Sequence, residues 1–202
     1  MAGGDLRVPD QDLVAKAQRS DAEAFGELYE RHRERVYRIA YRFVHNKADA
    51  LDLCQEVFVR AYQSLPNFQR KAKFTTWLTR IANNACVDFC RLAKLRRAGE
   101  LDEEGVKEDL RRPGVRPSPK PSEGLEREEI REAVDAAIEE LSPDHRAVFV
   151  LHSVEGLTYE EIATTVGCPI GTVMSRLHYA RKHLQGILSW VKQDENDEAV
   201  SE

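Results

Sequence analysis

Residues 170–185 place small, polar and basic side chains together on one side of a predicted helix. At 100° per residue, one arc of that helix contains Gly171, Ser175, His178 and Lys182. Met174 and Tyr179 flank this arc, and Arg181 adds a second cation beside it. Small and polar side chains at the start of a helix can reach base edges in a DNA major groove, while cations contact phosphates. The pattern therefore predicts that this face binds DNA.

Two short helices must position that face. The preceding helix begins with a capping box, in which Thr158 is followed three residues later by Glu161. Gly167 suits the left-handed position that ends this helix, and Pro169 suits the first turn of the next one. The arc expected to be buried is apolar and contains Val173, Leu177, Ala180 and Leu184. These features indicate a helix-turn-helix, although a small three-helix packing unit without a ligand would share some of them.

Charge is distributed unevenly along the 202 residues, whose formal net charge is -5. Residues 60–97 contain nine Lys or Arg and one acid, and residues 170–192 contain four Lys or Arg and no acid. The acids gather in residues 100–109, 123–140 and 194–202. Because salt screens electrostatic fields within about 10 Å, two local basic surfaces can each bind a polyanion despite the negative total.

The first basic stretch includes a predicted loop, FQRKAKF at residues 68–74, whose cations are Arg70, Lys71 and Lys73. Trp77, Asn83 and Asn84 follow directly on the next predicted helix. A single-stranded nucleic acid needs a flat face for stacking, donors and acceptors for its base edges, and charge for its backbone. The loop and the helix supply all three. The same residues also fit a role without a ligand, in which the cations are solvated and Trp77 belongs to the core.

Apolar residues recur every three or four positions in three longer segments, and each segment predicts an amphipathic helix with one buried stripe. The stripes are Phe25, Leu28, His32, Val36, Ile39 and Phe43; Leu51, Cys54, Phe58, Ala61 and Leu65; and Leu78, Ile81, Ala85, Phe89 and Leu92. A shorter helix is expected over residues 10–19. Ser20 and Asp21 are expected to cap the next helix, and residues 65–67 to stop the one after it.

A change in composition separates these helices from the helix-turn-helix. Residues 99–124 contain four prolines and four glycines, strong charge and few apolar side chains, and such a segment cannot bury enough surface to fold. We therefore expect an all-α protein made of two small helical domains. The first would occupy residues 10–97, a flexible linker residues 98–124, and the helix-turn-helix domain residues 125–192.

Other features narrow the class of protein. The four cysteines, Cys54, Cys86, Cys90 and Cys168, lack CxxC or zinc-finger spacing and are expected to be buried free thiols, with a thiol switch or a metal pair as the alternative. The chain has no Gly-rich phosphate loop, HExxH motif or nucleophile elbow, so we expect neither catalysis nor a cofactor or metal. No apolar run approaches the roughly 20 residues that span a bilayer, and no signal peptide is visible, which favours a cytoplasmic protein.

Two motifs together carry a resemblance to a known family. The first combines DLCQEVF at residues 52–58 with FTTWLTRIANNACVDFCR at residues 74–91, and the second extends from LSPDHRAVF at residue 141 to HYAR at residue 181. Over about residues 10–97 and 125–190 the chain closely resembles the extracytoplasmic-function (ECF) sigma factors, which are initiation subunits of bacterial RNA polymerase. The resemblance implies a first domain that binds core polymerase and melts the minus-10 element, and a second that reads the minus-35 element. It also implies bacterial core polymerase, promoter DNA and an anti-sigma factor as partners.

By position, the resemblance assigns roles to three sets of residues. Docking to core polymerase would involve Asp52, Gln55 and Glu56. A pocket for a base flipped from the minus-10 element would consist of Arg70, Lys71, Lys73, Trp77 and Asn84. Contacts with the minus-35 duplex would come from Tyr159, Glu160, Met174, Ser175, His178 and Tyr179, in addition to the phosphate contacts already expected of Arg181 and Lys182. Many family members have Arg in place of Met174, and a thioether cannot form the bidentate bond that Arg makes with guanine, so base preference at this position is open.

A free-standing helix-turn-helix transcriptional regulator is the alternative. It would account for residues 158–185, but it leaves the basic surface of residues 60–97 and the DLCQEVF segment without a role. Such a regulator would bind promoter duplex tightly with no polymerase present.

Overall fold

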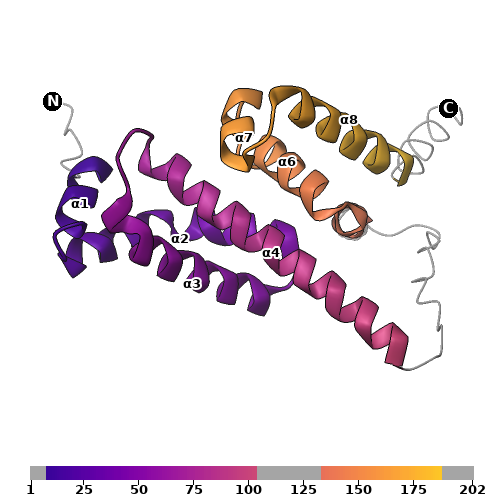
Figure 1. The fold of residues 1–202 in the computed structure, drawn as a ribbon, viewed down its shortest axis with the longest axis horizontal. Helices are drawn as coiled ribbons and strands as arrows, with labels where there is room; N and C mark the ends of the chain where they lie inside the picture. The colour runs from indigo at the N-terminus through magenta and orange to yellow at the C-terminus, as the bar shows by residue number, and fades with distance from the viewer. Residues whose placement is uncertain (1–7, 104–132, 188–202) are drawn as a thin grey trace, which may run out of the picture.

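The computed structural model describes residues 8–103 and 133–187, and every regular element in these two ranges is a helix. The first domain, residues 8–103, contains α1 (Asp10–Ala17), α2 (Ala22–Val44), α3 (Lys47–Ser64), the 3-10 helix η1 (Leu65–Asn67) and α4 (Phe74–Glu103). The second domain, residues 133–187, contains a helical segment at 133–140, α6 (Pro143–Ser153), α7 (Tyr159–Val166) and α8 (Ile170–Ile187). The two groups of helices lie side by side, with α6 between α4 and α8 (Figure 1). The predicted all-α class with two helical domains is confirmed.

Capping residues set the helix ends in the first domain. Asp21 caps α2, as predicted, by accepting a hydrogen bond from the Ala24 amide at 3.0 Å. His45 ends α2 in the left-handed region, with φ of 49°, and Asn46 then caps α3 by accepting from two backbone amides. This pair of residues reverses the chain so that α3 packs against α2.

Apolar side chains of α2, α3 and α4 form the core of the first domain. The core contains most members of the predicted stripes: Leu28, Val36, Ile39, Phe43, Cys54, Phe58, Ala61, Leu65, Leu78 and Ala85. Phe25, His32, Ile81 and Phe89 are half-buried. Periodicity in the sequence therefore identified the packing face of each long helix.

Two members of the predicted stripes, Leu51 and Leu92, are not buried, since each is 54% exposed. Helix α3 packs against both α2 and α4, and it buries Leu53 and Val57 together with the predicted stripe residues, so its buried arc is displaced from Leu51. Leu92 follows Cys90, which is the last residue of α4 that packs against the core cluster of the first domain.

Helix α4 continues beyond the predicted end of the first domain at residue 97, and its last residue is Glu103. Gly99 does not terminate it, because a single glycine costs a helix only about 1 kcal/mol and residues 100–103 include good helix formers. The rest of the predicted linker, from residue 104, lies outside the described residues, as do residues 125–132 and 188–192 of the predicted second domain.

The second domain contains the predicted helix-turn-helix in α7 and α8. Thr158 and Glu161 form both hydrogen bonds of the capping box, and Gly167 ends α7 in the left-handed region with φ of 74°. Pro169 immediately precedes α8, and its carbonyl accepts from the first-turn amides. The predicted apolar arc of α8 is buried: Val173, Leu177, Ala180 and Leu184.

The two domains pack directly against each other through α6. Ala147 and Val150 of α6 belong to the same buried cluster as the core of the first domain. Ion pairs also join the domains: Arg35 with Glu155 at 2.5 Å, Arg42 with Asp135 at 3.2 Å, and Arg91 with Asp144 at 3.2 Å. Acids of the second domain thus neutralise cations on the first.

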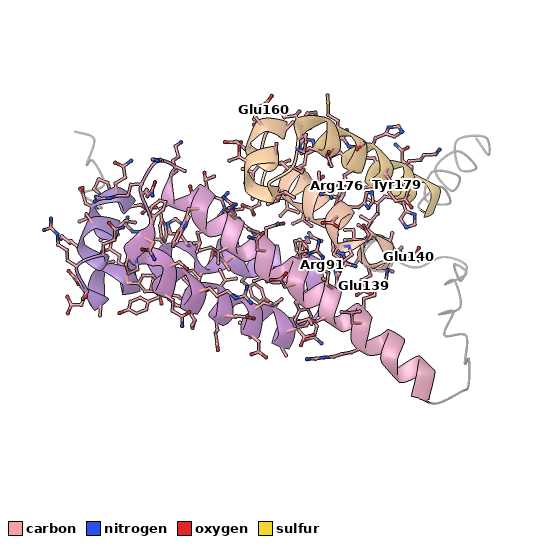
Figure 2. The ribbon with its side chains drawn as sticks, in the orientation of Figure 1. Arg91, Glu139, Glu140, Glu160, Arg176 and Tyr179 are labelled. Atoms are coloured by element: carbon pink, nitrogen blue, oxygen red, sulfur yellow. The ribbon has the colours of Figure 1, made fainter. Side chains whose placement is uncertain are left out.

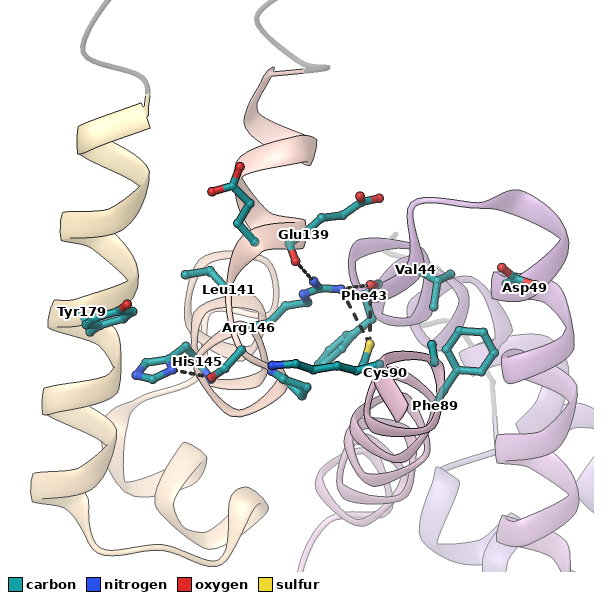
Figure 3. A pocket seen from close by; sticks show the side chains of 15 residues that line it. Phe43, Val44, Asp49, Phe89, Cys90, Glu139, Leu141, His145, Arg146 and Tyr179 are labelled. Carbon is teal, nitrogen blue, oxygen red and sulfur yellow. Dashed lines mark hydrogen bonds between the residues drawn. The ribbon is translucent and has the colours of Figure 1, made fainter. Parts of the chain in front are cut away.

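Arg146 forms the most deeply buried polar contact between the domains. Its guanidinium extends from α6 and donates to the carbonyl oxygens of Phe43, in α2, and of Glu139, in the segment before α6 (Figure 3). It also lies 3.7 Å from the sulfur of Cys90. A cavity of about 530 Å³ opens beside this contact, with walls from both domains.

The cysteines are free thiols, but only two of them are buried as predicted. Cys54 and Cys86 lie in the core of the first domain, where burial raises the pKa of both thiols. Cys90 and Cys168 are half-buried. The first faces the domain interface and the second lies in the turn between α7 and α8, so neither is enclosed by one domain core.

Candidate nucleic-acid interfaces

The predicted DNA-binding face of α8 is exposed. Its polar arc contains Gly171, Ser175, His178 and Lys182, all exposed, and Arg181 is exposed beside it. Met174 is 53% exposed. Because the apolar arc is fixed in the core, the helix can present only this face to a groove. The structure therefore brings these predicted minus-35 residues together on one surface.

Hydrogen bonds determine what some of these side chains can offer. The Ser175 hydroxyl donates to the carbonyl of Thr172 at 3.0 Å, so its proton is occupied and its lone pairs remain as acceptors. Two residues stand apart from the main arc. The Tyr179 ring lies 4.5 Å from the ring of His145, centroid to centroid, and Tyr159 is half-buried with an edge-to-face contact to His152.

Figure 2 shows how the labelled residues of the second domain are arranged. Glu160 lies at the start of α7, and its side chain is exposed. Arg176 and Tyr179 lie on the side of α8 that faces α6. Arg176 approaches Asp144 at 3.9 Å, and together with burial it lowers the pKa of His145, with burial the larger cause. Tyr179 and Arg176 are thus partly engaged with α6, while Glu160 is free of the core.

The basic loop of the first domain connects η1 to α4. Arg70, Lys71 and Lys73 are exposed, and the ion pairs among the described residues do not include them. Arg70 adopts φ of 56°, which turns the backbone sharply at that position. The loop is held by Gln18, the residue directly after α1, whose side chain donates to the carbonyls of Leu65 and Phe68, each at 2.9 Å.

Trp77 and Asn84 lie seven residues apart on α4 and therefore on the same side of the helix. Trp77 is half-buried, with its ring stacked on Phe68 at a centroid distance of 4.7 Å. Asn84 is exposed, whereas Asn83 is only 2% exposed and faces a different direction. One ring face of Trp77 is thus occupied by Phe68. The sequence left open whether Trp77 belongs to the core or to the nucleic-acid surface, and a half-buried ring is compatible with both roles.

Two residues of this surface were not predicted. Arg80 is exposed on α4 between Trp77 and Asn84 and adds a cation to their face. Arg80 lies three residues after Trp77 and four before Asn84, so helical periodicity could have assigned it to the same face. Gln18 had no such signal, because its contacts with residues 47 and 50 positions away depend on the tertiary fold.

The predicted polymerase-docking residues lie on the outer side of α3. Asp52, Gln55 and Glu56 are all exposed, and Glu56 forms an ion pair with Arg60 at 2.5 Å. Gln55 also lines an open apolar hollow whose other walls are Phe25, Tyr29, Phe58, Val59, Tyr62 and Gln63. Val59 and Tyr62 are at least half exposed, which places an unpredicted apolar surface directly beside the polar residues.

The described residues offer neither of two other kinds of site. No helix among them is long and apolar enough to cross a membrane. Within the same ranges, no three His, Cys, Asp or Glu side chains come together as a metal-binding group.

Comparison with known proteins matches both domains. A family model described as Sigma-70 region 2 matches residues 28–96, and one described as Sigma-70, region 4 matches residues 131–184. The ECF RNA polymerase sigma factor SigE of Mycolicibacterium smegmatis is 39% identical over 166 residues, which are 82% of this chain and 62% of that protein, less than two thirds of its length. The RNA polymerase sigma-H factor of Pseudomonas aeruginosa is 35% identical over 181 residues, with 89% of this chain and 93% of that protein covered. The ECF RNA polymerase sigma-E factor of Escherichia coli is 35% identical over 178 residues, with 87% and 92% covered.

Two solved structures have a similar fold. CnrH in complex with the cytosolic domain of CnrY is 26% identical with a TM-score of 0.63, and 89% of this chain and 97% of that chain are covered. The sigma factor RpoE in complex with the anti-sigma factor NepR from Bartonella quintana is 25% identical with a TM-score of 0.60, and 83% and 98% are covered. The family models match both domains in order, and two of the relatives match this chain over nearly their whole length. This chain therefore belongs to the family of ECF RNA polymerase sigma factors.

Proposed function

We propose that this protein binds bacterial core RNA polymerase, recognises minus-35 and minus-10 promoter elements, and assists strand opening at the start of transcription. The observation that carries the proposal is the presence of two exposed basic surfaces on two separate domains. One is the acid-free face of α8, and the other is the loop of residues 68–74 with the adjoining face of α4. A protein with two such surfaces can hold one DNA molecule at two places.

The face of α8 supports recognition of the minus-35 duplex. Ser175 and His178 are exposed on this face and would touch base edges, and Met174 is exposed beside them. Arg181 and Lys182 are also exposed and would contact phosphates, which position a helix without reading sequence. Glu160, Tyr159 and Tyr179 contribute from the edges of the same surface.

The loop and α4 support capture of an unstacked base from the minus-10 element. Arg70, Lys71 and Lys73 supply charge for the strand backbone, and Asn84 supplies donors and acceptors for a base edge. The half-buried Trp77 ring, which packs on Phe68, would supply a flat surface for stacking. Extraction of a base costs a few kcal/mol, which stacking and edge hydrogen bonds offset.

The outer side of α3 supports docking to core polymerase. Asp52, Gln55 and Glu56 provide polar contacts, and the hollow that contains Val59 and Tyr62 provides apolar area beside them. An anti-sigma factor is a further proposed partner, because the sigma factor RpoE, which this chain resembles in fold, was solved in complex with the anti-sigma factor NepR. We place this non-catalytic role in the cytoplasm, where polymerase and promoters are found.

In vitro transcription tests the proposal. Purified protein is mixed with bacterial core polymerase and genomic promoter fragments, and transcription start sites are mapped. We expect specific initiation only when both components are present. Tight, specific binding of promoter duplex by the protein alone, with no polymerase-dependent start sites, would show a free-standing regulator instead.

A further inference from the structure

Two large apolar side chains are exposed at the start of α8. Ile170 is 42% exposed and Met174 is 53% exposed, although the buried arc of the same helix encloses Val173 and Leu177 almost completely. Ile170 and Met174 are four residues apart, so their side chains are neighbours on the helix surface. They form an apolar pair in the first turns of the helix, the part that enters a major groove most deeply in this motif.

The surroundings of the apolar pair favour DNA over a protein partner. Gly171 is exposed, and a Cβ there would meet no atom within 4 Å, so the groove-facing side of the first turn is open to close approach. Helix α8 carries three cations and no acid. Arg181, two turns after Met174, lies on the same side of the helix at a position suited to a phosphate. This charge is complementary to a DNA backbone.

The chemistry of the pair selects one group in the groove. A thioether and an alkyl chain form no useful hydrogen bond with the O6 and N7 acceptors of guanine or with the amino groups of adenine and cytosine. Thymine alone among the four bases presents a methyl group in the major groove. We propose that Ile170 and Met174 recognise the C5-methyl groups of thymines in the minus-35 element. This inference rests on the proposed function and names the ligand of one part of its DNA-binding face.

Replacement of thymine by deoxyuridine tests the inference directly, because it removes the methyl and leaves every hydrogen-bonding group in place. Holoenzyme made from the full chain and core polymerase first selects its preferred minus-35 sequence from a randomised library. Each thymine of that sequence is then replaced by deoxyuridine, and affinity is measured by competition. We expect at least one position at which wild type binds deoxyuridine about fourfold more weakly, the change that corresponds to removal of one buried methyl.

Matched variants assign the effect to the apolar pair. Met174→Gln keeps the length of the side chain and makes it polar, while Met174→Leu keeps it apolar with similar volume. We expect Met174→Gln or Ile170→Thr to remove most of the discrimination between thymine and deoxyuridine, and Met174→Leu to retain it. Because both side chains are substantially exposed, none of these changes is expected to affect folding.

Three results would overturn the inference. If wild-type holoenzyme binds every deoxyuridine-substituted element as tightly as the parent sequence, it does not read methyl groups. A Met174→Gln holoenzyme with undiminished preference for thymine over deoxyuridine reads them with other residues. Loss of core binding by Met174→Gln, with DNA recognition unchanged, would assign the pair to polymerase. In each case the library still yields a preferred sequence and the proposed function stands, whereas a library that yields none would count against the proposed function as well.

Discussion

At the scale of single residues, one hydrogen bond decides what Ser175 can read. A free serine hydroxyl both donates and accepts, but here its proton is directed at the Thr172 carbonyl. The oxygen lone pairs then face the groove as acceptors. Adenine and cytosine present amino donors in the major groove, whereas guanine and thymine present acceptors. Ser175 is therefore expected to favour adenine or cytosine at the base it contacts.

Replacement of Ser175 by Ala should reduce this preference about fivefold, which corresponds to one hydrogen bond worth roughly 1 kcal/mol. Selection from a randomised minus-35 library measures it. Lys182→Ala is the matched control, since loss of a phosphate contact should weaken binding to all sequences and reduce the salt slope by about one. An identical consensus for wild type and Ser175→Ala would show that Ser175 does not contact a base.

The sequence predicted exposed residues more reliably than their contacts. The face of α8 follows from helical periodicity, so Ser175, His178 and Lys182 were placed correctly without a structure. The stacking of Phe68 on Trp77 was not predictable, because it depends on how the loop folds back against α4. The contacts of Gln18 could not be predicted for the same reason, since they join the end of α1 to a loop far along the chain.

At the scale of elements, the basic loop is held in position from the C-terminal end of α1, where Gln18 caps the helix. The Gln18 amide donates two hydrogen bonds to the backbone where the loop begins, and the Phe68 ring then packs on Trp77. The neighbouring cations of this loop repel one another, so its conformation depends on these hydrogen bonds and ring contacts. Gln18 is thus a positioning residue for the proposed base-capture surface, although it touches no DNA itself.

Gln18→Glu tests this dependence, because glutamate has nearly the same shape and cannot donate to the two carbonyls. We expect about thirtyfold less promoter opening, from the loss of two hydrogen bonds of roughly 1 kcal/mol each, with minus-35 occupancy unchanged. Permanganate reactivity of thymines near the start site measures opening. A pre-melted template should restore transcription, and a variant that opens duplex promoters as well as wild type would remove Gln18 from this role.

Helix α3 yields a second prediction at this scale. Asp52 is exposed, so Asp52→Arg should leave the fold intact and weaken binding to core polymerase more than about tenfold by reversing a charge at the interface. Glu34→Arg, an equal charge change at an exposed position of α2, is the control and should bind normally. Pull-down with core polymerase and circular dichroism measure the two properties. Undiminished binding by Asp52→Arg would contradict the docking role.

Two residues of the predicted apolar stripes, Leu51 and Leu92, are exposed because of how the helices pack. Periodicity shows which residues share a face, but the buried width of that face depends on the neighbouring helices. Leu51 is exposed because α3 packs against two partners that bury a displaced arc, and Leu92 because it lies beyond Cys90, the last residue of α4 that packs against the core. Neither property is local, and so neither could be predicted from residue spacing.

At the scale of the whole molecule, the domain interface has the character of a separable contact. It contains ion pairs together with apolar contacts from Ala147, Val150 and Val154. The Glu155 carboxylate is 2% exposed and one of its oxygens has no hydrogen-bond partner among the described residues. Buried charges of this kind contribute little net stability, because the loss of hydration offsets their attraction.

The interface should also respond to pH through His45. Its ring lies 3.4 Å from Asp135, with Glu139 and Arg146 nearby, and burial is the main cause that lowers its pKa despite the two acids. The packed arrangement therefore prefers the neutral ring. The stability that the packed arrangement gains from a neutral His45 is fully present above the ordinary pKa of 6.5, and it decreases as pH falls through that value.

We expect the domains to separate more readily at pH 5.5 than at pH 7.5. Energy transfer between dyes on the two domains measures the separation. His45→Asn removes the titrating ring and keeps a residue that tolerates the left-handed backbone, so it should reduce the pH dependence. An unchanged dependence in His45→Asn would assign the response to other groups.

The bond between Arg146 and the Phe43 carbonyl has a consequence for comparative sequence studies. The acceptor is main-chain oxygen, which every amino acid possesses, so substitutions at position 43 leave the acceptor itself intact. The Arg42–Asp135 pair, in contrast, requires two matching side chains. Covariation among relatives can therefore reveal the Arg42–Asp135 contact, whereas the bond between Arg146 and the Phe43 carbonyl imposes no matching side chain at position 43.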